Sequence, residues 1–190
     1  MPRLIERLLI VVASFAVAIG VIALLSGGLL AGHDSPGVSG AASGPGVAFP
    51  DQGNAHLKPG QAPPRYDSEP PTSGPHRPAA TDRNGAQLSD DQLLQALSVG
   101  DVVLMYGTPR PPAGLAAVAD GVAPAPFSPA LAATGQAVVL AYRPGTTGVI
   151  GLAWAHMVHV RSPTDPTLRS FGEYWLGRGA PQRGGALPSS

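Results

Sequence analysis

Tyr66-Asp67-Ser68-Glu69-Pro70-Pro71-Thr72-Ser73-Gly74-Pro75-His76 is the stretch around which the rest of this sequence is organised. Its three prolines each fix φ at about −65° and remove a backbone donor, whereas Gly74 is free to take a positive φ. This segment, the 66–76 loop, therefore has few conformations available. A stiff loop is either a structural corner or a binding site, and its candidate binding residues are Tyr66, Ser68, Thr72, Ser73 and His76.

The composition of the chain narrows the possible classes of function. Among 190 residues, 25 Gly and 22 Pro with only 13% charged residues favour one modest domain plus non-globular segments. The net charge is zero and no basic cluster lies outside the N-terminus, so nucleic acid is not an expected partner. Because cysteine is absent, disulfides, thiolate metal sites and a cysteine nucleophile are excluded.

The N-terminal segment has the pattern of a membrane anchor. Residues 8–32 carry no charge, and 8–25 are almost wholly apolar, long enough to cross a hydrocarbon core of about 30 Å. Arg3 and Arg7 precede this run, whereas Asp34 is the first charge after it, which predicts a cytoplasmic N-terminus. We expect a single-pass anchor in the lipid bilayer of the cell membrane and an extracytoplasmic C-terminal domain. The alternative is a cleaved signal peptide, whose apolar region is normally shorter, about 7–15 residues.

The remaining sequence divides by composition. A Gly-, Ser-, Ala- and Pro-rich stretch after the anchor cannot bury enough surface to be ordered, and a similar composition returns at the C-terminus. We predict an anchor at 1–32, a flexible linker at 33–55, a folded domain at 56–177 and a disordered tail at 178–190.

Local signals within the folded part predict an α+β domain with a sheet of about three strands packed by short helices. Ser89, Ser128 and Asp165 are good N-caps for three helices, and Gly100 and Gly177 are stop signals. The expected helices lie at 90–98, 113–119, 129–134 and 166–176, and the strands at 101–106, 136–142 and 149–160. The last two strands, joined by a short turn, are expected to form an antiparallel hairpin.

Histidines are the candidate metal ligands. His56 and His76 flank the 66–76 loop, whose turn can bring them together, and they would favour copper or zinc. The alternative is that they satisfy backbone groups left unpaired by the prolines. If 149–160 is one strand, His156 shares a face with Ile150 and His159 lies on the opposite face, so the two cannot bind one ion.

A hydrolase is a weaker hypothesis. Ser73 and His76 would be its nucleophile and base, but the sequence has no G-x-S-x-G elbow, no S-x-x-K motif and no evident carboxylate to orient the histidine. We therefore assign no catalytic residue.

A longer pattern of residues resembles the signature of a known protein family. His56, Gly60-Gln61 and Tyr66-x-Ser68-x-Pro70-Pro71-Thr72-Ser73-Gly74-Pro75-His76 together resemble the signature of domain-of-unknown-function family 3105, an uncharacterised bacterial family of membrane-anchored extracytoplasmic proteins. The resemblance spans roughly residues 56–177. It implies topology and location, because the family has no settled activity.

The sequence departs from the family pattern at one motif. Where the family usually reads His-x-Leu-Glu-His-Gly, this chain has Gln95-Ala96-Leu97-Ser98-Val99-Gly100. If the family's histidines form a metal or catalytic cluster, this chain keeps His56 and His76 without their partners, and two ligands hold a catalytic metal poorly. We therefore expect a non-catalytic binding or accessory module that presents the 66–76 loop to an envelope protein or component. The alternative is a copper- or zinc-binding envelope protein.

Overall fold

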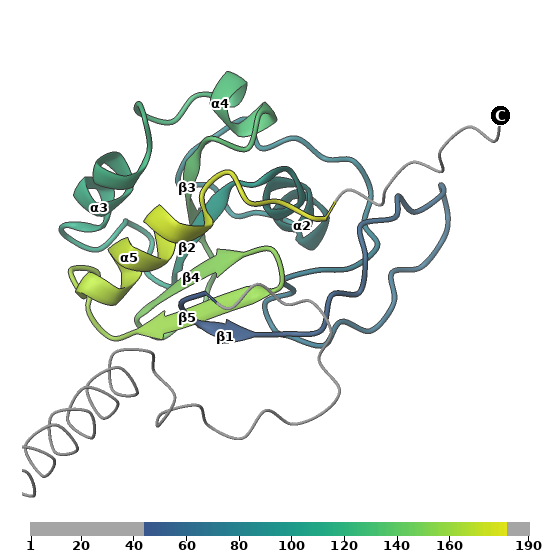
Figure 1. Cartoon of the computed structure of the whole chain (residues 1–190), viewed down its shortest axis with the longest axis horizontal. Helices are drawn as coiled ribbons and strands as arrows, with labels where there is room; N and C mark the ends of the chain where they lie inside the picture. The colour runs from purple at the N-terminus through teal and green to yellow at the C-terminus, as the bar shows by residue number, and fades with distance from the viewer. Residues whose placement is uncertain (1–43, 182–190) are drawn as a thin grey trace, which may run out of the picture. The chain divides into compact units, whose positions relative to one another are not determined.

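The computed structural model describes residues 44–181 as an α+β domain (Figure 1). In this part of the chain a five-stranded sheet is covered by four helices. The predicted anchor at 1–32 and the first part of the predicted linker lie outside the described residues. Between residues 44 and 181, no helix has the length and apolar character needed to span a bilayer.

The sheet has the strand order β1-β5-β4-β2-β3, and all neighbouring strands are antiparallel except β2 and β3, which are parallel. The strands are β1 (Val47–Ala48), β2 (Val102–Tyr106), β3 (Val138–Tyr142), β4 (Val149–Ala153) and β5 (His156–Val160). The prediction of about three strands was therefore wrong. The predicted strand at 149–160 is two strands, which a tight turn at Trp154 and Ala155 folds back on each other.

The predicted hairpin between β3 and β4 was also wrong. β2 lies between them, paired in parallel with β3 on one side and antiparallel with β4 on the other. The parallel pair follows from the long connection between β2 and β3, which contains two helices, since parallel strands require such a crossover. The true hairpin is β4–β5, with Ala153 opposite His156 and Ile150 opposite His159.

Strand β1 lies inside the segment predicted to be a linker, so the described part of that segment, 44–55, is attached to the domain. Val47 pairs with Met157 at the sheet edge, and the Phe49 amide donates to the Ala155 carbonyl at 2.8 Å. At the other end, the Ala180 amide donates to the Ser98 carbonyl at 2.9 Å, which holds the first residues of the predicted tail. These backbone contacts do not depend on side chains, so composition could not predict them.

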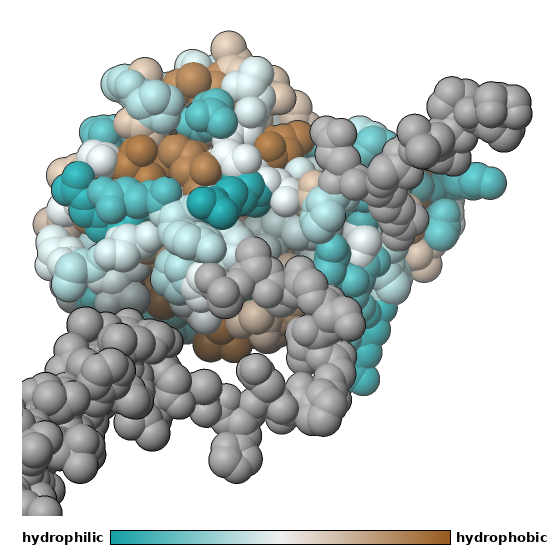
Figure 2. Space-filling view, in the orientation of Figure 1, coloured by the Kyte–Doolittle hydropathy of each residue, from teal (hydrophilic) through white to brown (hydrophobic). Residues whose placement is uncertain are grey.

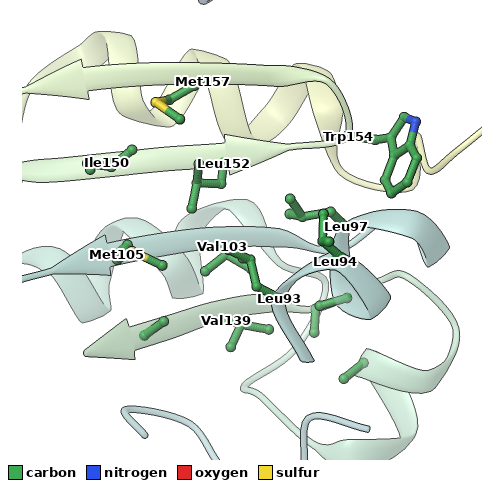
Figure 3. Close-up of a cluster of buried hydrophobic side chains, with 14 of the residues drawn as sticks. Leu93, Leu94, Leu97, Val103, Met105, Val139, Ile150, Leu152, Trp154 and Met157 are labelled. Atoms are coloured by element: carbon green, nitrogen blue, oxygen red, sulfur yellow. The ribbon is translucent and has the colours of Figure 1, made fainter. Parts of the chain in front are cut away.

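Helices cover both faces of the sheet. They are α2 (Asp90–Val99), α3 (Leu115–Val122), α4 (Pro129–Ala133) and α5 (Pro166–Trp175). On one face, leucines of α2 pack over side chains of β2, β3 and β4, as Figure 3 shows for Leu93, Leu97, Val103, Val139 and Leu152. On the other face, α3 and α5 pack against the same strands, and the predicted α5 stripe of Leu168, Phe171 and Trp175 is buried as expected.

The predicted caps are also present. The Ser89 side chain and Gln92 form a capping box at the start of α2, and Gly100 ends this helix in a left-handed conformation. The Ser128 side chain accepts from the Leu131 amide at the start of α4, and the Asp165 side chain accepts from the Thr167 amide at the start of α5. Local sequence signals therefore placed these helix ends correctly.

In the described part of the chain, nearly all large hydrophobic side chains are at least partly buried. On the side shown in Figure 2, hydrophilic and hydrophobic residues are interspersed and the hydrophobic ones form small groups. Among the large hydrophobic residues that the structure describes, only Val47 and Val99 are exposed. A binding site is therefore better sought in a cavity than on a broad apolar surface.

Candidate functional site

The 66–76 loop is closed by its own hydrogen bonds. The Tyr66 hydroxyl donates to the Pro75 carbonyl at 2.9 Å. The Ser68 hydroxyl accepts from the Thr72 amide at 3.0 Å and lies 3.0 Å from the Thr72 hydroxyl. Because these bonds join the two ends of the loop, the loop is rigid, as its prolines predicted.

Ser73 ties the loop to the segment that follows β1. Its hydroxyl donates to the Pro50 carbonyl at 3.0 Å and accepts from the Gln52 amide at 3.1 Å. Thr72 and Ser73 are buried, and the Thr72 carbonyl accepts from the Ala155 amide at 2.9 Å in the β4–β5 turn. The hydroxyls of these two residues therefore satisfy internal groups, and the candidate binding residues Thr72 and Ser73 do not face solvent.

Two arginines hold the rim of the loop. Arg143, which follows β3, forms ion pairs with Glu69 and with Asp90 of α2, the latter at 3.2 Å. The Arg77 amide donates to the Asp91 carboxylate at 2.9 Å. The loop is thereby fixed to the start of α2.

His76 is fully buried at the end of the loop. Its Nδ1 lies 2.9 Å from the Gly74 carbonyl, which only accepts, so Nδ1 carries the proton and Nε2 is left as an acceptor. No hydrogen-bond partner reaches that Nε2 among residues 44–181. Since neither the Ser73 hydroxyl nor the His76 ring donates to the other, the pair lacks the geometry of a nucleophile and its base.

The loop brings His56 and His76 together, as the sequence predicted. Their backbones form an isolated parallel bridge, in which the Leu57 amide donates to the His76 carbonyl at 2.9 Å. The ring centroids lie 5.7 Å apart in an edge-on arrangement, and His56 is exposed. In the described part of the chain, no group of three or more His, Cys, Asp or Glu residues is placed to hold a metal ion.

The other two histidines do not join this pair. They lie on opposite faces of β5, as predicted, but on the faces opposite to those expected. His156 lies on the face of Ala153 and stacks on Trp175 of α5 at 3.8 Å, whereas His159 lies on the face of Ile150. The physical reason is the β4–β5 turn, which reverses the chain and resets the alternation of side chains.

A cavity of about 470 Å³ lies beside His56, between α2, α4 and the segment that follows the 66–76 loop. We call it the His56 cavity. It is lined by His56, Pro78, Ala79, Ala80, Thr81, Asp82, Gln95, Ala96, Val99, Asp101, Pro129, Ala132 and Ala133. Its volume is within the range of small-molecule sites, about 300–1,000 Å³.

Three residues of the His56 cavity carry buried oxygen atoms without a hydrogen-bond partner in the structure: Thr81 Oγ1, Gln95 Oε1 and Asp101 Oδ2. The other Asp101 oxygen accepts from the Ala137 amide at 2.8 Å. Burial raises the pKa of Asp101 to about 7, although that hydrogen bond acts to lower it. Buried polar atoms are normally satisfied, and these three oxygens have almost no accessible surface, so they lie beneath the cavity wall.

The degenerate motif lines the same cavity. Gln95 and Val99, at the two positions where the resemblance implies histidines, are one turn apart on α2 and both face the His56 cavity. His56 and the two positions of this motif therefore line the same cavity. The sequence analysis singled out His56, Gln95 and Val99 but missed Thr81, Asp82 and Asp101; the i, i+4 spacing of Gln95 and Val99 is a signal that would have indicated this face of α2.

Comparison with known protein families identifies a match for this chain. The family model described as "Protein of unknown function (DUF3105)" matches residues 58–187, more than half of the chain, including the 66–76 loop and all of α2. Neither the comparison with curated proteins nor the comparison with solved structures gave a match. The extent of the family match establishes that this chain belongs to that family of proteins of unknown function.

Proposed function

We propose that this protein is a non-catalytic binding or accessory module, in which the 66–76 loop is a rigid frame that holds His56 beside a ligand cavity. The observation that carries the proposal is the His56 cavity itself, about 470 Å³ in volume and lined by His56, Gln95 and Val99 among others. This volume is within the range of small-molecule sites.

The hydrogen bonds made by Ser73 and His76 favour binding over catalysis. The Ser73 hydroxyl is engaged by Pro50 and Gln52, and the imidazole of His76 is fixed on the Gly74 carbonyl. Each group is held by backbone atoms that would have to be released before it could react. The loop residues Tyr66, Ser68, Thr72, Ser73 and His76 thus act on a ligand by positioning the backbone of His56.

The setting we propose is the outer side of the cell membrane. The apolar run at 8–25 would anchor the chain in the lipid bilayer, and an envelope protein or component would supply or receive the ligand. In right-side-out membrane vesicles, added protease should remove a C-terminal tag without lysis of the vesicles. Protection of the tag until lysis would contradict this topology.

The binding role can be tested with short four-carbon probes on the full chain in lipid nanodiscs. We expect at least one of n-butanol, butyrate and n-butylammonium to shift the methyl NMR signals of Ala96 and Val99, which line the cavity. The methyl signal of Ala119, a buried residue of α3 on the other face of the sheet, should stay unchanged.

The matched variant is Ala133→Trp, which places a large side chain at an exposed position on the cavity lining. It should abolish the shifts at Ala96 while leaving the rest of the spectrum intact. If none of the probes shifts these signals in the wild type, the cavity is not a binding site.

A metal-binding role is the second candidate. It is favoured by the unpartnered Nε2 of His76, whose ring lies edge-on to the exposed His56 ring at 5.7 Å. Two imidazoles would bind Cu²⁺ or Zn²⁺ with open positions for other ligands. A Zn²⁺ titration of the full chain should show weaker binding in His56→Ala but not in His159→Ala. Equal binding by both variants and the wild type would rule the site out.

A further inference from the structure

We propose that residues 61–65, Gln-Ala-Pro-Pro-Arg, are a docking segment for a protein domain whose groove is lined by aromatic side chains and bordered by carboxylates. We call these residues the 61–65 arm. The proposal does not depend on the His56 cavity, because no residue of the arm lines that cavity. It is carried by the backbone conformation of the arm, by its free carbonyl groups, by its unpaired charges and by the contrast with a second proline-rich segment.

The 61–65 arm has an extended backbone. It contains no helix, strand or turn. The rings of Pro63 and Pro64 fix φ at about −65°, and the proline that follows Ala62 or Pro63 keeps each of these residues out of the helical region. The peptide bonds before both prolines are trans. Together these restrictions favour the polyproline II conformation.

Both ends of the arm are held by the rest of the domain. The Arg77 guanidinium donates to the Gln61 carbonyl, and the Gln52 side-chain amide donates to the Arg65 carbonyl at 3.2 Å. Just before the arm, the Gln61 amide donates to the Lys58 carbonyl at 3.0 Å and closes a turn. Much of the conformational entropy of the arm is therefore lost before any partner binds, which favours affinity.

The middle of the arm is free to bind. Ala62, Pro63 and Pro64 are exposed, and within residues 44–181 their backbone groups form no hydrogen bond. The arm therefore presents carbonyl acceptors and exposed pyrrolidine rings. Grooves that bind polyproline II segments supply the complement, because their aromatic side chains pack on the rings and the N–H of Trp or the hydroxyl of Tyr donates to the carbonyls.

The charge beside the rings is positive. Arg65 ends the arm and Lys58 precedes it, and both are exposed. Neither side chain forms an ion pair in the part of the chain that the structure describes. Residues 58–65 contain no Asp or Glu. A groove bordered by carboxylates would therefore be attracted, and one bordered by Lys or Arg would be repelled.

A second proline-rich segment, residues 108–112, lacks these properties and serves as the control. The Thr108 hydroxyl donates to the Arg110 carbonyl at 2.7 Å, and the Leu115 amide donates to the Pro112 carbonyl at 3.1 Å. Pro112 is also partly buried. The carbonyls of this segment are thus engaged within the domain, whereas those in the middle of the 61–65 arm are not.

The test is photo-cross-linking of the full chain in membranes of its own cells. The photoreactive residue p-benzoylphenylalanine replaces Pro59, an exposed turn residue beside the arm, or Pro109 in the control segment. We expect a protein adduct from position 59 and none from position 109. The peptide acetyl-Gln-Ala-Pro-Pro-Arg-amide should displace the adduct, and the same peptide with both prolines changed to alanine should require about tenfold more. Mass spectrometry should place the cross-link beside Trp or Tyr residues of the partner.

Variants of the full chain test the rings and the charge separately. The double substitution Pro63→Ala, Pro64→Ala should lower the adduct yield by about tenfold, because both rings are lost. Arg65→Glu should lower it by a similar factor, whereas Arg110→Glu in the control segment should change it by less than about twofold. Each variant should keep the urea midpoint of the wild type, because none of the replaced side chains forms a hydrogen bond within residues 44–181.

Three outcomes would overturn the docking role: no adduct from position 59, equal displacement by the two peptides, or a cross-link to lipid instead of protein. The peptide competition leaves the arm of the chain unchanged, so the test remains decisive if a variant does not fold. The alkyl probes of the His56 cavity are read independently, so a failure here leaves the proposed function standing.

Discussion

His56 and His76 lie side by side on a parallel backbone bridge, with their ring centroids 5.7 Å apart, although residues 57–75 separate them in sequence. One ring is exposed and the other is fully buried. The buried ring fixes the base of the loop, and the exposed ring lies on the His56 cavity. The two histidines therefore have different roles despite their proximity.

Gly74→Ala should destabilise the domain more than Gly60→Ala does. Gly74 has a φ of +128°, and a Cβ there would lie 2.8 Å from the Tyr66 ring. We expect a loss of about 1–3 kcal/mol in the free energy of unfolding, measured by urea denaturation. Gly60→Ala is the matched control, because Gly60 also has a positive φ, +79°, but nothing lies within 4 Å of its Cβ position. Equal losses in the two variants would show that contact with Tyr66 is unimportant.

Ser73→Ala should reduce stability without affecting any ester hydrolysis. The substitution leaves the Pro50 carbonyl and the Gln52 amide without their partner, which costs about 1–3 kcal/mol in the free energy of unfolding. Ser162→Ala, at an exposed turn, should change stability by less than about 0.5 kcal/mol. A drop in p-nitrophenyl acetate turnover in Ser73→Ala relative to Ser162→Ala would revive the hydrolase hypothesis.

The stability of the protein should depend on pH through Asp101. Its folded-state pKa is raised from 3.8 to about 7, so between these values the folded state binds more protons than the unfolded state. This contribution to stability is fully present below about pH 4 and is lost as the pH rises toward about 7. Asp101→Asn keeps an acceptor for the Ala137 amide but cannot ionise.

The urea midpoint of the wild type should therefore fall relative to that of Asp101→Asn as the pH is raised from about 5 to about 8. Comparing the two proteins at each pH cancels the other titrating groups. Parallel pH profiles would mean that Asp101 has an ordinary pKa.

Trp175→Phe should loosen the segment that carries β1. The Trp175 indole donates to the Pro45 carbonyl at 2.8 Å, and phenylalanine keeps an aromatic ring beside His156 without that hydrogen bond. Hydrogen exchange of the Phe49 amide, which is bonded to the Ala155 carbonyl, should become about tenfold faster. Exchange in β2, which lies between β4 and β3 on the far side of the sheet from β1, should stay the same. Unchanged exchange at Phe49 would show that β1 is held by its strand pairing alone.

Elements defined by neighbouring residues were predictable from sequence. Ser89 and Gly100 bound α2, and the residues of β2 form an apolar run that fits a buried central strand. The number and order of the strands were not predictable. The β4–β5 turn contains no Gly, Pro, Asn or Asp, and its Ala155 adopts a φ of 57°, so no local signal marked it.

The sequence alone predicted the stiffness of the 66–76 loop and the capped ends of the main helices, and the tertiary structure placed His56 beside His76. The stiffness and the helix ends depend on proline, glycine and capping residues that act over a few positions. Only the tertiary structure decided that β2 separates β3 from β4 and that Thr81, Gln95 and Asp101 share one cavity. Such contacts join segments far apart in the chain, and their side chains carry no periodic pattern, so they become visible only when the sheet and α2 are packed together.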